Sequence, residues 1–332
     1  MTRLLLLIAL VAAVLAAAGP VPVIFDTDMG NDIDDAVALA ILHALESRGE
    51  CRLVAVTLTK DHPLAAPYVD ILNHFYGRPK IPVGVVKNGK TTDPGNYLKV
   101  AFDRKKPDGS PAYPRRINDG RQAPDAVSLL RRVLAAEKDG SVVIAQVGFS
   151  TNLARLLDSG PDAASPLAGM ELAKRKVRLL SVMAGHFRDP NYAEYNVKID
   201  VPSAKKLFAE WPGAVVFSGF EVGLAMHVSA RSIDTDYGWV PAHPVVDAYR
   251  AYKKPPYNSP TWDPTAALYA VRPDRDYFSL SEPGLVRVDD AGRTRFEPAA
   301  GGRHRYLIVN ETQRARTEEA MMALASEPCV IH

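Results

Sequence analysis

The chain has 332 residues, of which 47% are hydrophobic and 23% are charged, a composition typical of a folded globular protein. It excludes a disordered, collagen-like or coiled-coil chain. Forty Lys and Arg residues against 38 Asp and Glu give a formal net charge of +2, so the overall charge provides no general attraction to nucleic acid or to an anionic membrane. Any ligand is therefore expected to be held by a local site.

The N-terminal segment is predicted to be a targeting signal. Met1-Thr2-Arg3 precedes an unbroken apolar run of 15 residues, from Leu4 to Ala18, and small residues follow. This pattern is typical of a secretory signal peptide, and the run is shorter than the roughly 20 residues that a membrane-spanning helix needs. We expect residues 1–19 to be removed and the mature chain, residues 20–332, to be secreted or periplasmic. An uncleaved membrane anchor is the alternative.

Short apolar runs then alternate with amphipathic stretches, which predicts repeated strand–helix units. The polar segment 87–123, which contains nine Lys or Arg residues, is expected to be a surface loop, either a lid near an opening or a solvated insertion. Repeated strand–helix units favour one α/β domain over residues 20–332, with a mostly parallel, Rossmann-like central sheet and helices on both faces. The predicted strands are 21–25, 52–58, 81–86, 141–147, 177–183, 214–217 and 305–309, with a hairpin over 285–295; the predicted helices are 33–47, 65–76, 125–137, 152–157, 203–210, 243–252, 264–271 and 312–325.

The chain has two cysteines, Cys51 and Cys329. In an oxidising compartment they could form a disulfide that links the C-terminal tail to the rest of the domain. Two unrelated thiols are the alternative, and the sequence does not separate the two.

Five carboxylates fall within ten residues, directly where the first predicted strand ends and the first predicted helix begins. Like charges this close repel one another, and their burial costs several kcal/mol unless a cation or a helix dipole compensates. Capping of the helix explains one or two acidic residues but not five. A hard divalent cation such as Ca²⁺ fits such a set of oxygens, and ligands of parallel sheets bind at the carboxyl ends of the strands. The five residues are Asp26, Asp28, Asp32, Asp34 and Asp35.

This acidic segment resembles the N-terminal signature of the inosine–uridine nucleoside hydrolase family, Asp-x-Asp-x-Gly-x-Asp-Asp-Ala. The chain carries two additional residues between the glycine and the final pair of aspartates. Three further segments resemble family motifs in the same order: residues 147–154, 193–196 and 262–264. Together they cover most of the mature chain, and their combination is far more specific than any one of the last three.

The resemblance implies hydrolysis of the N-glycosidic bond of ribonucleosides, or of related N-ribosides, to a free base and ribose with Ca²⁺. Asp28 would take a proton from a metal-bound water that attacks C1′. Asp26 and Asp32 would orient the ligands from outside, unless Asp32 joins the cation or replaces Asp34. The family also suggests a homodimer or homotetramer. The implied Ca²⁺ ligands are Asp28, Asp35, the backbone carbonyl of Thr151 and Asp263; the implied substrate-binding residues are Asp34, Asn191, Glu194, Asn196 and Trp262.

One position departs from the family pattern. Trp262 stands where many members have a histidine that helps to protonate the leaving base. An indole can stack on a nucleobase, but it cannot usefully donate a proton. Either another group acts as the acid, with His186 and His62 as candidates, or the enzyme favours leaving groups that are activated in another way.

Two other functions remain open from the sequence. The missing histidine leaves room for an exported, non-catalytic protein that binds nucleosides or sugars on the same scaffold. The Asp26-Thr-Asp28 motif also resembles the nucleophile motif of haloacid-dehalogenase-like phosphatases, although that motif does not explain Asp34, Asp35 or Asp263. Nucleic acid and, after signal cleavage, membrane are not expected as partners.

Overall fold

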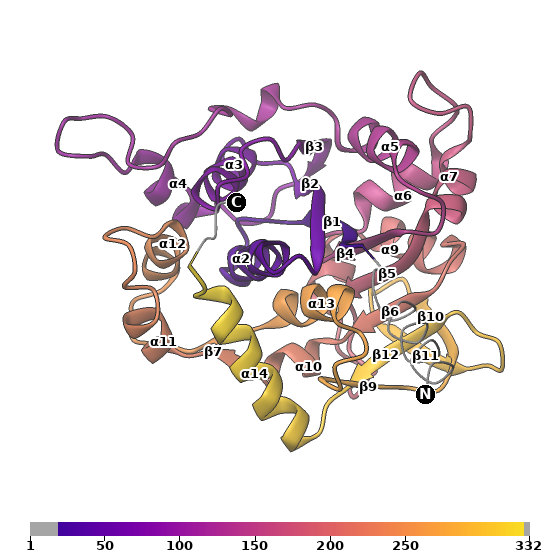
Figure 1. Cartoon of the computed structure of the whole chain (residues 1–332). Helices are drawn as coiled ribbons and strands as arrows, with labels where there is room; N and C mark the ends of the chain where they lie inside the picture. The colour runs from indigo at the N-terminus through magenta and orange to yellow at the C-terminus, as the bar shows by residue number, and fades with distance from the viewer. Residues whose placement is uncertain (1–18, 329–332) are drawn as a thin grey trace, which may run out of the picture.

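A ten-stranded sheet forms the centre of the described part of the chain, residues 19–328 of the computed structural model (Figure 1). Strands β3-β2-β1-β4-β5-β6-β12 follow one another in that order and are parallel, whereas β10, β11 and β9 add an antiparallel edge. A separate pair joins β7 to β8. The strands are β1 Val21–Thr27, β2 Cys51–Lys60, β3 Val83–Lys90, β4 Val142–Gln146, β5 Val177–Met183, β6 Val215–Ser218, β7 His227–Val228, β8 Ser259–Pro260, β9 Ser279–Leu280, β10 Gly284–Val288, β11 Thr294–Pro298 and β12 His304–Ile308.

Helices cover both faces of the sheet, which confirms the predicted fold class (Figure 1). Side chains of β1 alternate between the two faces: Val23 and Phe25 belong to a buried cluster with residues of α2, α3, α12, α13 and α14, and Ile24 belongs to a second cluster with residues of α5, α6, α7 and α9. The helices are α2 Asp34–Ser47, α3 Ala65–Phe75, α4 Asn96–Asp103, α5 Ala126–Ala136, α6 Thr151–Asp158, α7 Gly169–Lys176, α8 Tyr195–Ile199, α9 Val201–Glu210, α10 Phe220–Leu224, α11 Ala230–Thr235, α12 Pro244–Tyr252, α13 Trp262–Val271 and α14 Glu311–Ala325.

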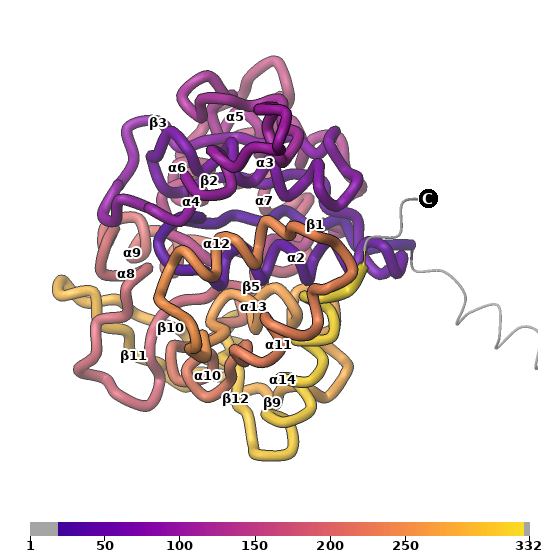
Figure 2. The backbone as a smooth tube through the Cα atoms, turned by 90° about the vertical axis from the view of Figure 1, so that its left-hand side faces the viewer, coloured from indigo at the N-terminus to yellow at the C-terminus, as the bar shows by residue number. Residues whose placement is uncertain are grey.

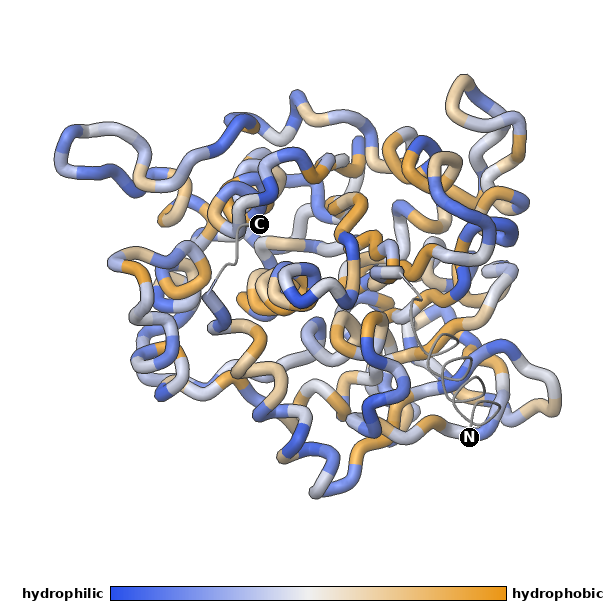
Figure 3. Tube along the Cα trace, in the orientation of Figure 1, coloured by the Kyte–Doolittle hydropathy of each residue, from blue (hydrophilic) through white to orange (hydrophobic). Residues whose placement is uncertain are grey.

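Two of these helices are buried along most of their length. Every residue of α2 from Asp34 to Leu45 and every residue of α13 from Asp263 to Val271 is buried. Both helices are rich in apolar residues and lie in the interior, where Figure 3 shows mainly hydrophobic colouring. A charged residue at the start of either helix is therefore held inside the protein.

The segment 87–123 differs from its prediction as a loop. Its first residues continue β3 to Lys90, and α4 follows, with Tyr97 and Leu98 buried against the core. Figure 2 shows α4 beside α12, and an ion pair between Arg104 and Asp247 joins the end of α4 to α12. The many charges and prolines of the segment concealed this short amphipathic helix.

The order of the strands places a crevice at the tip of β1. The chain runs from β1 outward to β2 and β3, and then returns to the other side of β1 with β4. Helices of the two halves consequently lie on opposite faces, and such a reversal leaves an opening at the carboxyl ends of the two central strands. Asp26, near the end of β1, is in register with Thr57 of β2 and Gln146 of β4.

Two predictions for the ends of the sequence concern residues that lie largely or partly outside the described range. The predicted signal peptide, residues 1–19, is described only at Gly19, and Cys329 lies beyond the last described residue. Cys51 is buried, and its thiol contacts the carbonyl of Leu42. The Cys51–Cys329 disulfide therefore stays a prediction. Within residues 19–328, no helix has both the length and the apolar character needed to cross a membrane.

Candidate active site

The turn between β1 and α2 carries the acidic residues into the crevice. Gly30 adopts a φ of +113°, in the region that favours glycine, and a side chain there would collide with Leu98 of α4. Gly148, after β4, also has to be small, because a Cβ would lie 2.4 Å from the backbone nitrogen of Asp28. These two glycines allow the β1 turn to pack closely against its neighbours.

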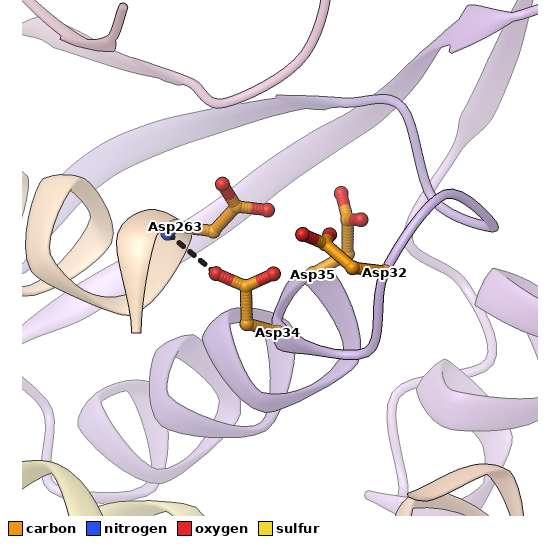
Figure 4. Close-up of side chains that lie close together, drawn as sticks. All are labelled: Asp32, Asp34, Asp35 and Asp263. Atoms are coloured by element: carbon orange, nitrogen blue, oxygen red, sulfur yellow. Dashed lines mark hydrogen bonds between the residues drawn. The ribbon is translucent and has the colours of Figure 1, made fainter. Parts of the chain in front are cut away.

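Four aspartates converge at this point, three from the turn and the start of α2 and one from the start of α13 (Figure 4). One carboxylate oxygen of each lies within 4.8 Å of the others. The backbone N–H of Asp263 donates to a carboxylate oxygen of Asp34 at 2.9 Å, which ties the two helix starts together. The group consists of Asp32, Asp34, Asp35 and Asp263, and is called the acidic cluster below.

Burial and mutual repulsion disfavour the charged forms of these carboxyls. Burial, with a contribution from the charge of Asp32, raises the pKa of Asp35 to about 7. The pKa values of Asp34 and Asp263 lie well above the usual range for the same two reasons. A cation among these carboxyls would remove both penalties.

The hydrogen bonds of the acidic cluster leave room for such a cation. Asp34 Oδ1, Asp35 Oδ2 and Asp263 Oδ2 are buried and have no hydrogen-bond partner within residues 19–328. Buried carboxylate oxygens normally accept hydrogen bonds or bind a metal, because leaving them unpaired costs free energy. Oxygen-only donors of this kind match the preference of Ca²⁺ and other hard cations. The residues present therefore fit a divalent metal.

Asp26 and Asp28 lie beside the acidic cluster and differ in their surroundings. Asp26 is fully buried, and one of its oxygens accepts hydrogen bonds from Thr57 at 2.6 Å and Asn152 at 2.8 Å. Burial raises the pKa of Asp26 to about 7, although these two bonds oppose the rise. Asp28 borders a cavity, and burial, together with the charges of Asp35 and Asp32, raises its pKa well above the usual range.

A cavity of about 260 Å³ opens above the carboxyl ends of β1, β4 and β5. It brings together predicted residues that are distant in the sequence, and its lining combines carboxylates with aromatic rings. Its lining consists of Asp28, Asn31, Asp32, Asp93, Val147, Met183, Glu194, Tyr195, Asn196, Phe220, Tyr252, Trp262 and Asp263.

Three of the five predicted substrate-binding residues, Glu194, Asn196 and Trp262, line this cavity, whereas Asn191 and Asp34 do not. Glu194 is buried and accepts hydrogen bonds from the backbone N–H groups of Gly185 and Asn196. The side-chain nitrogen of Asn196 donates to the carbonyl of Val147 at 2.8 Å, so its oxygen is the atom available to a ligand. Asn191 is exposed and is not part of the cavity lining.

Two other predicted residues lie deeper than the cavity surface. Asp34 and Asp35 are almost completely buried and belong to the acidic cluster rather than to the lining. The side-chain hydroxyl of Thr151, at the start of α6, donates to Asp200, and the role predicted for Thr151 belongs to its backbone carbonyl. The acidic cluster thus shares Asp35 and Asp263 with the predicted ligand set and adds Asp32 and Asp34.

The lining of the cavity includes no histidine among the described residues. The indole N–H of Trp262 donates to the carbonyl of Phe220 at 3.0 Å, and the two rings stack with centroids 5.4 Å apart. His186 also stacks on Phe220, and the two ring centroids lie 5.5 Å apart. His62 contacts the carbonyl of Pro94 and lies outside the cavity lining.

Sequence reasoning missed several residues of the site. Asn31, Asp93 and Tyr252 line the cavity, and Lys60 is buried beside it at the end of β2. Burial lowers the pKa of Lys60, while the neighbouring Asp28 opposes that shift. A lysine that directly follows an apolar strand was a usable signal, because the end of a central parallel strand is a buried position.

Comparison with known proteins agrees with this geometry. A family model described as inosine-uridine preferring nucleoside hydrolase matches residues 23–323. The chain belongs to this family. This confirms the resemblance read from the sequence motifs and gives no support to the phosphatase alternative. No curated protein sequence matches the chain.

Solved structures of similar proteins share the fold. A plant nucleoside hydrolase, PpNRh1, is 21% identical with a TM-score of 0.68, over 93% of this chain and 100% of that chain. An inosine-uridine preferring nucleoside hydrolase from Bacillus anthracis is 18% identical with a TM-score of 0.67, over 92% and 99% of the two chains. The type III effector protein XopQ, in complex with adenosine diphosphate ribose, is 17% identical with a TM-score of 0.65, over 95% and 97%.

Proposed function

We propose that this chain hydrolyses the N-glycosidic bond of ribonucleosides, or of related N-ribosides, to a free base and ribose with the help of Ca²⁺. The observation that carries the proposal is the set of three unpartnered, buried carboxylate oxygens from Asp34, Asp35 and Asp263 beside a cavity lined by carboxylates and aromatic rings. Family membership supports the reaction class, and the oxygen-only donor set supports a hard cation.

Asp35 and Asp263 form the centre of the proposed Ca²⁺ site. The family resemblance adds Asp28 and the carbonyl of Thr151, whereas the acidic cluster adds Asp32 and Asp34. Bound Ca²⁺ would offset the repulsion among these carboxylates and make a neighbouring water easier to ionise. Asp26, held by Thr57 and Asn152, would orient the ligands from behind.

The other side chains would bind the sugar and remove a proton. Asp28 borders the cavity, where its carboxylate would act as the general base that takes a proton from the attacking water. Glu194 and the oxygen of Asn196 would accept hydrogen bonds from ribose hydroxyls, with Asp34 contributing from the acidic cluster. The carboxylates would also stabilise the positive charge that develops on the sugar in an oxocarbenium-like transition state.

The base would stack on Trp262, whose only hydrogen-bond donor is already used by the carbonyl of Phe220. Trp262 therefore cannot replace the histidine that many family members carry at this position. No other described residue of the cavity is a histidine, so we propose that the enzyme favours leaving groups that need little help from a protein acid.

The place of action is also proposed from the sequence. Residues 1–19 would direct export and be removed, so that the mature protein acts as a secreted or periplasmic enzyme on a small nucleoside. The mass of the N-terminal peptide of the exported protein tests this directly. A homodimer or homotetramer stays a prediction.

The decisive experiment incubates the purified mature chain with a panel of purine and pyrimidine nucleosides, with Ca²⁺ or with a chelator. We expect free base and reducing sugar to appear together, and only with the metal. Binding without turnover across the whole panel would favour the non-catalytic alternative, in which the missing histidine marks a lost activity.

A further inference from the structure

Lys60 is a charged residue inside the site whose role the function above does not explain. It is the last residue of β2. The whole residue is only 1% exposed, and its ammonium group lies next to the β1 turn. Nζ donates to the carbonyl of Gly30 at 2.9 Å and to Oδ1 of Asn31 at 2.6 Å. Burying an ammonium group costs several kcal/mol, so both contacts are part of what keeps it there.

Asn31 connects this lysine to the proposed base. Its Nδ2 donates to a carboxylate oxygen of Asp28, while its Oδ1 accepts from Lys60. An ammonium group can only donate, so the amide oxygen of Asn31 has to face Lys60 and the amide nitrogen has to face Asp28. The planar amide is thereby fixed at both ends, and the lysine determines which way Asn31 presents its donor.

The backbone of the same turn has a second, independent support. The hydroxyl of Tyr97, from α4, accepts from the N–H of Gly30 at 2.8 Å and donates to the carbonyl of Asp32 at 2.6 Å. Tyr97 is buried and makes no contact with the Asn31 side chain among its hydrogen bonds within residues 19–328. Removing Lys60 therefore leaves the turn attached to α4, while it frees the amide of Asn31 to rotate.

We propose that Lys60 is a positioning residue that, through Asn31, holds the carboxylate of Asp28 in the orientation needed to take a proton from water. This inference rests on the proposed function, in which Asp28 is the base. Because Lys60 carries a positive charge beside the acidic cluster, it opposes cation binding electrostatically while it supports turnover. A residue that merely stabilised the turn would support both.

The test compares Lys60→Met, which keeps the length of the side chain without its donors, with Lys87→Met as a matched control. Lys87 also donates to two backbone carbonyls, those of Arg121 and Ala123, but it lies away from the cavity. We expect Lys60→Met to lower kcat by about 10–100-fold, the usual cost of losing an outer partner of a site residue, with KM nearly unchanged. Ca²⁺ affinity, measured by calorimetry, is expected to change less than kcat, because loss of the positive charge favours the cation while a less ordered Asp28 carboxylate, itself an implied ligand, disfavours it. Lys87→Met is expected to leave all three quantities as in the wild type.

Asn31→Ala supplies the second arm. If the contacts act in series, the double variant with Lys60→Met loses no more turnover than the worse single variant. Additive losses would overturn the proposal, and so would an unchanged kcat in Lys60→Met or a loss of Ca²⁺ affinity as large as the loss of kcat.

A spectroscopic arm separates failure of this inference from failure of the proposed function. In the wild type, the side-chain N–H₂ group of Asn31 should exchange slowly with solvent, and in Lys60→Met it should exchange fast. If the wild type hydrolyses no nucleoside, the proposed function fails but this measurement still tests the contact chain. Slow exchange that persists in Lys60→Met would overturn the inference that Lys60 fixes Asn31.

Discussion

Two buried acidic regions in this domain use the same side chain for different purposes. Asp70, in α3, is fully buried, and its carboxylate accepts hydrogen bonds from the backbone N–H groups of Arg116 and Ile117. His74 and the Arg116 side chain lie 3.4 Å from its other oxygen. In the acidic cluster, by contrast, three of four residues keep an oxygen that accepts nothing within residues 19–328.

The difference shows that burial alone does not mark a functional aspartate. Asp70 is satisfied by the protein and fixes the segment around residues 115–118 onto α3. The protein leaves carboxylate oxygens of the acidic cluster without hydrogen-bond donors, so the stability of the cluster depends on a bound cation. Removal of the cation should therefore destabilise the acidic cluster and leave the Asp70 region unaffected. Substitutions at Asp70 should destabilise the Asp70 region and leave the acidic cluster unaffected.

Metal removal should have the largest effect. A chelator is expected to reduce nucleoside hydrolysis to the background rate, and added Ca²⁺ to restore it, because the carboxyls of the acidic cluster repel one another without a cation. The release of reducing sugar measures the activity, and calorimetric titration of the chelated protein measures the binding. Full activity in excess chelator would contradict the metal site.

The next effect concerns the proposed base. Asp28→Asn keeps the size of the side chain but cannot accept a proton, so kcat should fall about 10²–10⁴-fold. Asp28→Ala should abolish turnover as well. Asp70→Asn is the matched control and should keep the wild-type kcat for folded protein. An Asp28→Asn enzyme with wild-type kcat would remove Asp28 from the mechanism.

Asp70→Ala should act on stability instead. The change leaves the N–H groups of Arg116 and Ile117 without their acceptor, at a cost of about 1–3 kcal/mol for each donor that stays buried. We expect the free energy of unfolding in urea to fall by about 2–4 kcal/mol. The kcat of the folded fraction should not change, and a kcat loss at full folding would blur the distinction between the two regions.

The stability of the metal-free protein should depend on pH through the acidic cluster. Burial raises the pKa of Asp35 to about 7 from an ordinary value of 3.8, so between these values the folded state holds a proton that the unfolded state has released. Stability from this group is present at low pH and is lost as pH rises toward 7, by up to about 1.4 kcal/mol per pH unit.

Ca²⁺ should cancel this loss, because it binds the deprotonated carboxylates and its affinity rises with pH. The measurement is the difference between urea unfolding curves with Ca²⁺ and with chelator from pH 4 to pH 7. Taking the difference removes the opposite slope from His43, whose pKa burial lowers to about 3 in both conditions. A difference that stays constant with pH would contradict the prediction.

The smallest effect on catalysis is expected from the aromatic residues that line the cavity. Trp262→Ala removes a stacking surface worth about 0.5–1.5 kcal/mol, so KM should rise about 2–12-fold with a smaller change in kcat. Trp262→Phe keeps a ring and should lose less. Equal KM values for all three enzymes would show that the base does not stack on this residue.

The fold and the acidic part of the site could be predicted from the sequence because their signals are local. Asp26 to Asp35 lie together in the chain, and the apolar run before them places them at a strand end. The remaining site residues depend on packing between distant segments. Tyr97 contacts Gly30 across 67 positions, from a helix within a segment whose charges and prolines suggested a loop.

The prediction of which residues would hold the metal was limited by the same cause. The family motif selected Asp28, Asp35, Thr151 and Asp263, but in the β1 turn, which is two residues longer than the motif, Asp32 is part of the acidic cluster. Sequence spacing could not show this, because it depends on how Lys60 and Tyr97 hold the turn.

The hydrogen bond from the backbone of Asp263 to Asp34 has a consequence for the order of synthesis. Its two ends are 229 positions apart, so a ribosome releases most of the polypeptide before the second partner exists. A nascent or truncated product that ends before α13 lacks one wall of the pocket and cannot assemble the full set of ligands. The acidic cluster is therefore complete only after roughly the last fifth of the polypeptide, from α13 onward, has docked.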